Sequence, residues 1–390
     1  MSRTTVITCG TSILRNGIKD KPEEEFKALN LFLNRTANVR RKDCTREEEN
    51  TFLEIKRHVQ DRLADSDEKQ SRNLSAEPNG LIGYYRRKDK AGKDIMGDMP
   101  QDVYYFIHTD TYQGEIAAEL LEGWCRGQKG IRIVSLHKIQ DLNTASAEEF
   151  RAGINGLIQW CRAHLPEKHS EYNPVIFNLV GGFKVLQGYM QALGMFYAYE
   201  IVYIFEGSGE LLTIPRLPVD FNASAKQAVQ ENAVAFRKMS LEISVSHDEC
   251  KNANIPSSLL FVVDDVCLLF NWGELIWNEM KDKIYGEALL ESPAPNLIAY
   301  GNRFESEVEK LERDRVREVN QQVDALFRYL TGGRKDNLNS LDYKKLEVPS
   351  GKLDFQFKLW DDGKAMRALC CDDGKRVTID HMDHLWKEKR

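Results

Sequence analysis

The chain has 390 residues, which is longer than one hydrophobic core usually grows, so its length predicts two or three domains. Its 42% hydrophobic and 29% charged residues are typical of a globular protein, and a net charge of -6 argues against a protein that coats nucleic acid by charge alone. No apolar run approaches the roughly 20 residues of a membrane span, and the first residues read as a strand rather than a signal peptide, so we expect a cytoplasmic protein without a membrane partner.

The first 220 residues alternate strand-like and helix-like segments. Residues 4–10 are rich in β-branched residues, and residues 103–111 lead into the helical sequence GEIAAELLEGWC. Three further strand-like segments follow, in IRIVSLHKI, PVIFNLVGGFK and YEIVYIFEGSGELLTI. A charged stretch, residues 19–99, is inserted after the first strand; it has helical spacing, and SAEPNG within it reads as a loop. Strands that alternate with helices predict a doubly wound, mostly parallel α/β sheet.

The second half changes its pattern twice. Residues 222–300 give a weaker signal, in which LLFNWGELIWNEMKDKIYGEALL looks helical. From Arg303, apolar residues step by three to five along an amphipathic helix that ends at TGG. Two DDGK turns then predict a three-stranded antiparallel meander over residues 353–360, 364–371 and 375–382. We therefore expect an α/β domain (1–221), a helical connector (222–304) and a small α+β domain (305–390).

Three loops after predicted strands carry candidate ligand-binding residues: Gly10, Thr11 and Ser12; Thr109, Asp110 and Thr111; and Gly181, Gly182, Phe183 and Lys184. In an open α/β sheet, ligands bind beyond the carboxyl ends of the strands, where helix N-termini present free N–H groups. Glycines let the backbone approach an anion, although a tight strand-to-helix turn would also explain them. The GGFK sequence matches neither a dinucleotide fingerprint nor a P-loop, and the eight cysteines form no CxxC pair, so we expect no cofactor and no metal site.

Taken in order, TCGTSIL, HTDTYQGEIAAELL, FNLVGGFKVLQGYMQALG and VYIFEGSGEL resemble the CRISPR-associated Rossmann-fold (CARF) sensor domain over about residues 1–220. The resemblance implies a Rossmann-like homodimer that binds a cyclic oligoadenylate, usually the tetramer cA4, as an allosteric activator. Gly10, Thr11 and Ser12 would then meet the ring, together with Thr109, Asp110 and Thr111. The residues from Gly181 to Lys184 would hold its phosphates. The resemblance gives no role to the insert at residues 19–99.

Residues 305–390, with their amphipathic helix followed by the meander, resemble the RelE family of ribosome-dependent mRNA interferases. By that resemblance, Lys358 and Arg367 match a lysine and an arginine on neighbouring core strands. His384, Lys387 and Lys389 correspond to the last active-site strand, whose usual tyrosine is absent here, so either His384 replaces it or the mechanism manages without it. A lysine crowded by cations could take the 2′-hydroxyl proton of RNA while other cations stabilise the charge on phosphorus, without a metal. Solvated surface cations are the alternative interpretation.

Together these resemblances imply a cyclic oligoadenylate-activated mRNA endoribonuclease of type III CRISPR defence, whose partners are the cyclic ligand, mRNA on the ribosome and a second copy of the chain. From Arg334 onward, 13 Lys and Arg oppose 11 Asp and Glu, so charge alone would hold free RNA weakly and the ribosome would supply the positioning. Two other classes stay open. One is a ring nuclease that cuts the cyclic ligand in the sensor domain, and the other is a ligand-sensing transcription regulator, for which a helix-turn-helix with a basic recognition helix is missing.

Overall fold

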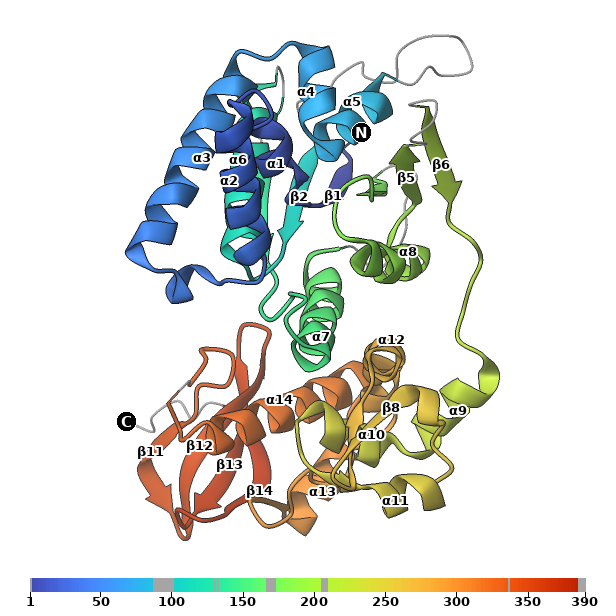
Figure 1. The fold of residues 1–390 in the computed structure, drawn as a ribbon. Helices are drawn as coiled ribbons and strands as arrows, with labels where there is room; N and C mark the ends of the chain where they lie inside the picture. Colours follow the sequence, from blue (N-terminus) through green and yellow to red (C-terminus); the bar gives the residue numbers. More distant parts are fainter. Residues whose placement is uncertain are drawn as a thin grey trace. The chain divides into compact units, whose positions relative to one another are not determined.

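The structure is a computed structural model that describes residues 2–86, 102–128, 131, 133–165, 173–204, 210–335 and 337–384, without the side chains of 348–350. The chain divides into two compact units, Met1–Asp220 and Phe221–Arg390. Figure 1 shows the fold of both units and labels most of their helices and strands. In the described residues, no helix is both long and apolar enough to cross a membrane.

The first unit is built on a six-stranded sheet with the strand order β3-β2-β1-β4-β5-β6. Five strands are parallel: β1 (Thr4–Thr8), β2 (Val103–His108), β3 (Ile133–Lys138), β4 (Val175–Asn178) and β5 (Glu200–Ile204). The last strand, β6 (Leu211–Pro215), runs antiparallel to β5. The predicted mostly parallel sheet is thus confirmed. Because β1 pairs with both β2 and β4, the order of the strands reverses there, and the switch point of the sheet lies between β1 and β4.

Helices cover both faces of this sheet. On one face, Ile176 and Val202 join an apolar cluster with residues of α1 (Ser12–Gly17), α3 (Arg46–Ala64), α4 (Glu68–Leu74), α5 (Ala76–Tyr85) and α6 (Tyr112–Gly127). On the other face, α8 (Lys184–Tyr197) packs on β4 and β5 and contacts α7 (Ala147–His164). The alternation of side chains along each strand therefore gives the sheet two apolar faces, as a doubly wound fold requires.

The insert between β1 and β2 builds most of one helical layer. It forms α2 (Glu23–Arg35), the short η1 (Arg41–Asp43), α3, α4 and α5, while residues 87–99 of it lie outside the described residues. Capping boxes start α3 at Thr45 and α4 at Asp67. The prediction of a loop at SAEPNG is wrong, because α5 begins within it. Pro78 lies in the first helical turn, where its missing N–H is harmless, so it does not break the helix.

The second unit contains a five-stranded sheet in the order β10-β14-β13-β12-β11. The predicted meander is confirmed as β12 (Leu353–Asp361), β13 (Ala365–Asp372) and β14 (Val377–His384), with turns at Gly363 and Gly374 whose φ angles are 94° and 84°. Two strands that the sequence pattern did not indicate extend it. β11 (Lys344–Ser350) pairs antiparallel with β12, and β10 (Ile298–Tyr300) pairs parallel with β14.

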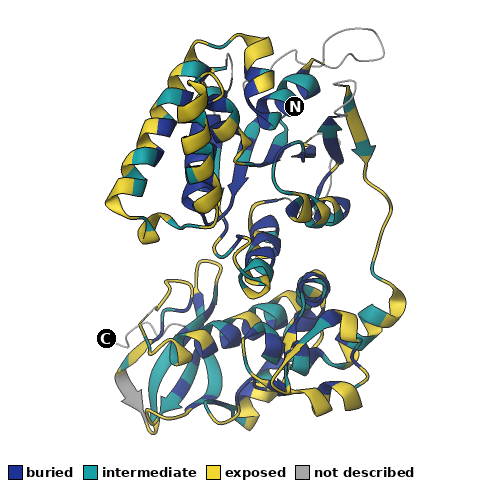
Figure 2. Cartoon of the chain, viewed as in Figure 1, coloured by how far each residue is buried: buried dark blue, intermediate teal, exposed yellow. Residues whose placement is uncertain are grey.

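The long helix expected after Arg303 is two helices, α13 (Asn302–Val308) and α14 (Arg313–Thr331). The break lets the apolar residues of both, such as Phe304 and Val323, enter one core with Phe357 and Ala368 of the sheet. The other face of this sheet is left largely half buried, as Figure 2 shows for β12 to β14. The second unit therefore presents one covered and one open sheet face.

Residues 222–304, expected as a helical connector, are not helical throughout. They contain four helices: α9 (Ala223–Glu231), α10 (Ala233–Ser240), α11 (His247–Asn252) and α12 (Asn271–Glu287). They also contain the short η2 (Ser257–Leu259) and a three-stranded antiparallel sheet in the order β7 (Val245–Ser246), β9 (Val266–Leu269) and β8 (Leu260–Val263). Asp264 and Asp265, with φ angles of 48° and 65°, form the tight turn between β8 and β9, a geometry that hairpins favour. The connector is a mixed α/β segment of the second unit.

Candidate functional site

Two of the three predicted ligand-binding loops meet at the switch point of the first sheet. The Thr8 hydroxyl donates a 2.6 Å hydrogen bond to the Gly181 carbonyl. A Cβ atom on Gly10 would lie only 2.9 Å from the Gly182 amide nitrogen, and Gly182 has a φ of 97°. Both glycines are thus required by close approach or backbone conformation. Thr11 and Ser12 are exposed before and at the start of α1, while Phe183 and the exposed Lys184 lie where α8 begins.

A buried carboxyl group, Glu77 of α5, occupies the space between these two loops. Its Oε1 accepts a 2.5 Å hydrogen bond from the Gly10 amide, and its Oε2 accepts one from the Ser75 hydroxyl. A Cβ atom on Gly181 would lie 1.9 Å from the same Oε1, so this glycine makes room for the carboxyl. Burial raises the pKa of Glu77, against hydrogen bonds from Ser75 and Gly10 that lower it. The insert therefore contributes directly to the switch point, which the sequence pattern did not indicate.

The third predicted loop, after β2, is tied into an ion-pair network. The Asp110 carboxylate is buried and lies 3.1 Å from Arg40 Nε and 3.5 Å from Lys138 Nζ. Thr111 caps α6 by accepting from the Gly114 amide at 3.1 Å, and its hydroxyl lies 2.9 Å from that of Thr109. These side chains are thus engaged within the protein.

A hollow of about 390 Å³ adjoins Asp110 and Thr111. It is also lined by Arg40, Arg41, Lys42, Glu115, Lys138 and Gln140. Arg40 forms ion pairs with Asp110, Asp141 and Glu149, and Arg41 with Glu115 and Glu49. Because acidic neighbours offset these cations, the hollow is polar without a large excess of positive charge.

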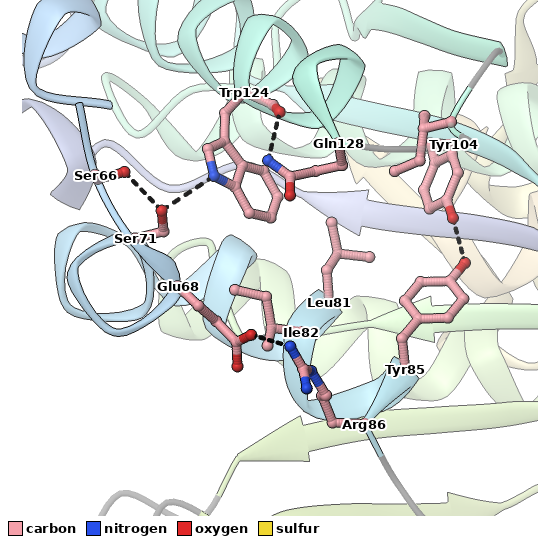
Figure 3. A pocket seen from close by; sticks show the side chains of 11 residues that line it. Ser66, Glu68, Ser71, Leu81, Ile82, Tyr85, Arg86, Tyr104, Trp124 and Gln128 are labelled. Carbon is pink, nitrogen blue, oxygen red and sulfur yellow. Dashed lines mark hydrogen bonds and ion pairs between the residues drawn. The ribbon is translucent and has the colours of Figure 1, made fainter. Parts of the chain in front are cut away.

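A second hollow, of about 170 Å³, lies between α4, α5 and α6 and contains none of the predicted site residues. In Figure 3 the hydroxyls of Tyr85 and Tyr104 face each other, and the Trp124 indole points to Ser71, whose oxygen accepts its N–H at 3.2 Å. Tyr85 also donates to Asp102, which directly precedes β2. This hollow is therefore at the amino ends of the strands, away from the predicted loops.

In the second unit, the structure brings Lys358 and Arg367 together. They are direct partners in the register of β12 and β13, so their side chains share the face that α14 leaves open. Asp383 of β14 is the next partner of Arg367 in the same row. Arg367 is only 3% exposed, and its guanidinium donates to the carbonyl and the carboxylate of Asp342.

The three other predicted catalytic residues do not join this pair. His384 pairs with Met366 and therefore lies on the opposite face from Arg367, because side chains alternate along a strand. A register shift between Leu369 and Cys370 causes this, since a single extra residue in β14 reverses which side chains share a face. His381, opposite Leu369, lies on the face of Arg367 instead. Lys387 and Lys389 lie outside the described residues.

In the described residues, no group of three or more His, Cys, Asp or Glu side chains is placed to hold a metal ion.

Comparisons with known proteins concern the first unit. Residues 72–217 match the model of a family described as CRISPR-associated protein (Cas_APE2256). A search of curated protein sequences found no match. The matched segment includes Glu77 and the loops after β2 and β4, and it ends before the second unit begins. It covers less than half of the chain. This similarity supports the interpretation of the chain as a CRISPR-associated protein.

Proposed function

We propose that the protein is a cyclic oligoadenylate-activated, ribosome-dependent mRNA endoribonuclease that arrests translation in type III CRISPR defence. The observation that carries the proposal is the direct pairing of Lys358 with Arg367 on the sheet face that lies away from α14. Directly opposed residues have Cβ atoms about 4.5–5.5 Å apart, so the two cations lie side by side. The match of the first unit to a CRISPR-associated family supports the biological setting.

In the proposed reaction, the Lys358 amine takes the proton of the 2′-hydroxyl, and the 2′-oxygen attacks phosphorus. The bond to the 5′-oxygen breaks, water protonates that oxygen, and the products are a 2′,3′-cyclic phosphate and a 5′-hydroxyl. The hydroxide left by the water takes the proton from the Lys358 ammonium, which restores the amine. The Arg367 guanidinium stabilises the charge that grows on the phosphate oxygens. The mRNA is presented by the ribosome, which compensates for weak binding of free RNA.

In the proposed activation, cA4 binds across a homodimer of the first unit in the cytoplasm. Backbone N–H groups of Gly181, Gly182 and Lys184 contact its phosphates, since they surround the switch point where such folds bind ligands. To activate the second unit, the ligand must bind the active state more tightly than the resting state. No metal or other cofactor takes part.

The test is in vitro translation with and without cA4, comparing the parent with Lys358→Ala and Arg367→Ala. Matched controls are Lys364→Ala and Arg376→Ala, which change exposed cations at the two hairpin turns of the same sheet. We expect the parent and the controls to arrest translation only with cA4, and each site variant to lose about 100-fold or more in rate. Arrest that is independent of cA4, or site variants as active as the controls, would refute the proposal.

The same preparation can be incubated with radiolabelled cA4. We expect the ring to stay intact over the time of translation arrest. Shortened label from a protein that leaves translation untouched would favour a ring nuclease instead.

A further inference from the structure

The Asp342 carboxylate lies among the cations of the open sheet face. It accepts a hydrogen bond from one Arg367 guanidinium nitrogen and lies 3.0 Å from Lys344 Nζ. Lys358 is the direct cross-strand partner of Arg367. Partial burial would raise the pKa of Asp342, but hydrogen bonds from Arg367 and Lys344 outweigh it and lower the pKa. One anionic oxygen is therefore held by a guanidinium and an ammonium group, the combination that proteins use to bind phosphate.

Arg367 has hydrogen-bonding capacity that Asp342 does not use. Its Nε is buried and has no hydrogen-bond partner among the described residues, although the residue is only 3% exposed. A buried donor without an acceptor is uncommon in folded proteins. A planar guanidinium offers five N–H donors, and a phosphate, with more acceptor oxygens than a carboxylate, can engage more of them.

The backbone at Asp342 is in an unusual conformation between two anchored neighbours. Its φ of 43° lies in the left-handed region, which residues other than glycine rarely adopt. On one side, the Leu341 carbonyl accepts from the Lys358 amide at 2.7 Å, and Leu341 is buried. On the other, Tyr343 exchanges two hydrogen bonds with Asn337. The Asp342 side chain is 33% exposed, so it can turn toward solvent while its neighbours stay in place.

We propose that Arg367, Lys344 and Lys358 form a binding site for an RNA phosphate, and that Asp342 occupies this site until RNA displaces its carboxylate. The inference rests on the proposed function in that RNA is the substrate, and it adds Lys344 as a binding residue and Asp342 as a built-in competitor. The exchange replaces one negative group by another, so the buried Arg367 is never left without a counter-charge, which would be strongly unfavourable. If Asp342 instead only positions Arg367, its charge should help RNA binding rather than oppose it.

The test measures RNA binding by fluorescence anisotropy of the full chain with a fluorescein-labelled hexaribonucleotide that carries 2′-O-methyl groups and cannot be cleaved. Asp342→Asn keeps the shape and an acceptor oxygen for Arg367 but removes the charge. We expect its Kd to fall about tenfold at low salt. The control is Asp383→Asn, which removes a charge on the other side of Arg367 in the same row, and we expect it to change Kd less than about threefold.

A second pair of variants keeps the test valid if Asp342→Asn folds poorly. Lys344 is exposed, and Lys345 is its exposed neighbour on the other face, where its ammonium lies over Phe355. We expect Lys344→Gln to weaken RNA binding about fivefold and Lys345→Gln to leave it unchanged. In the double variant Asp342→Asn with Arg367→Gln, the gain from Asp342→Asn should vanish.

Three outcomes would overturn the inference: unchanged or weaker RNA binding by Asp342→Asn, an equal gain in Asp383→Asn, or Lys344→Gln indistinguishable from Lys345→Gln. The probe cannot react, and neither ribosomes nor cA4 are present. Lost translation arrest together with the expected binding pattern would therefore refute the proposed function alone. Translation arrest without the binding pattern would refute this inference alone.

Discussion

Glu77 is a fully buried carboxyl group whose hydrogen bonds come from the Gly10 amide and the Ser75 hydroxyl rather than from a cation. Burial penalises its charged form, and this raises its pKa above the ordinary value of 4.5. Burial also raises the pKa of the neighbouring Cys9 thiol, which therefore stays neutral at neutral pH. The switch point thus contains a carboxyl that resists ionisation next to glycines expected to receive a phosphate.

The raised pKa of Glu77 predicts a defined pH dependence of stability. The stability that the protonated Glu77 carboxyl contributes to the folded protein is fully present below the ordinary pKa of a glutamate. This stability is lost as the pH rises through the raised pKa of Glu77 in the folded state. Glu77→Gln keeps the size and the acceptor for Gly10 but cannot ionise. We therefore expect it to gain stability relative to the parent as the pH rises from 5 to 8, by about 1.4 kcal/mol for each unit by which the pKa of Glu77 in the folded protein exceeds 5. Thermal unfolding at both pH values measures this.

The control for this experiment is Glu54→Gln on the exposed side of α3. Its stability difference from the parent should be the same at both pH values. If Glu77→Gln behaves like Glu54→Gln, the carboxyl of Glu77 ionises in the folded protein as readily as in the unfolded chain.

Single residues of the candidate sites were predictable when their own sequence neighbourhood carried the signal. Gly181 and Gly182 lie between a strand and a helix. Lys358 lies on the polar face of an alternating strand, and Arg367 interrupts an apolar run. The two carboxyls, Glu77 and Asp342, could not be assigned in this way. Glu77 reaches Gly10 across 67 positions of sequence, and Asp342 reaches Arg367 across 25, so only the folded chain brings them together.

At the scale of elements, a buried ion pair joins α10 to α14 within the second unit. Arg237 Nε lies 2.8 Å from Asp324 Oδ1, and both side chains are at most 2% exposed. The Tyr285 hydroxyl of α12 donates to the other Asp324 oxygen at 2.5 Å. Three helices are thereby fixed to one another, which explains why residues 222–304 are part of the second unit rather than a separate connector.

Breaking this ion pair should destabilise the second unit strongly. Asp324→Asn leaves the Arg237 charge buried without its counter-charge, and we expect a loss of about 3–5 kcal/mol in the free energy of unfolding. The control, Asp314→Asn, removes one partner of the exposed pair with Arg317 and should lose less than about 1 kcal/mol. Urea unfolding of the full chain measures both.

The double variant Arg237→Met with Asp324→Asn removes both charges of the pair. Because neither partner is then a buried charge, it should be more stable than Asp324→Asn alone. Equal losses in Asp324→Asn and Asp314→Asn would show that the pair contributes no more than a surface ion pair.

Local turn signals decided which elements could be predicted. The two DDGK turns fixed β12, β13 and β14, since Asp-Gly tolerates positive φ. β10 was missed because a three-residue strand that pairs in parallel has no hairpin turn that would indicate it in the sequence. The register shift between β13 and β14 was missed because it also has no turn signal in the sequence. This shift places His384 on the opposite face of the sheet from Arg367. Strands bounded by clear turn signals were readable from the sequence, whereas short strands without such turns and the register were not.

At the scale of the whole molecule, the chain is two units with different architectures, a doubly wound sheet and a helix-covered antiparallel sheet. The similarity to a CRISPR-associated family lies within the first unit. If that unit is the sensor, changes at its switch point should abolish the response to cA4 without altering what the second unit does by itself. This separation of effects can be tested with two glycines of the same segment.

Gly181→Ala would place a Cβ 1.9 Å from Glu77 Oε1, so the loop or the carboxyl must move, whereas a Cβ at Gly188 of α8 meets nothing within 4 Å. For the parent and Gly188→Ala, cA4 at 100 times Kd should raise the free energy of unfolding by about 2.7 kcal/mol. For Gly181→Ala, we expect little or no increase, with unchanged binding of the uncleavable RNA. An equal rise in all three proteins would exclude this loop from ligand binding. A loss of RNA binding in Gly181→Ala would instead mean that the two units do not act separately in the absence of ligand.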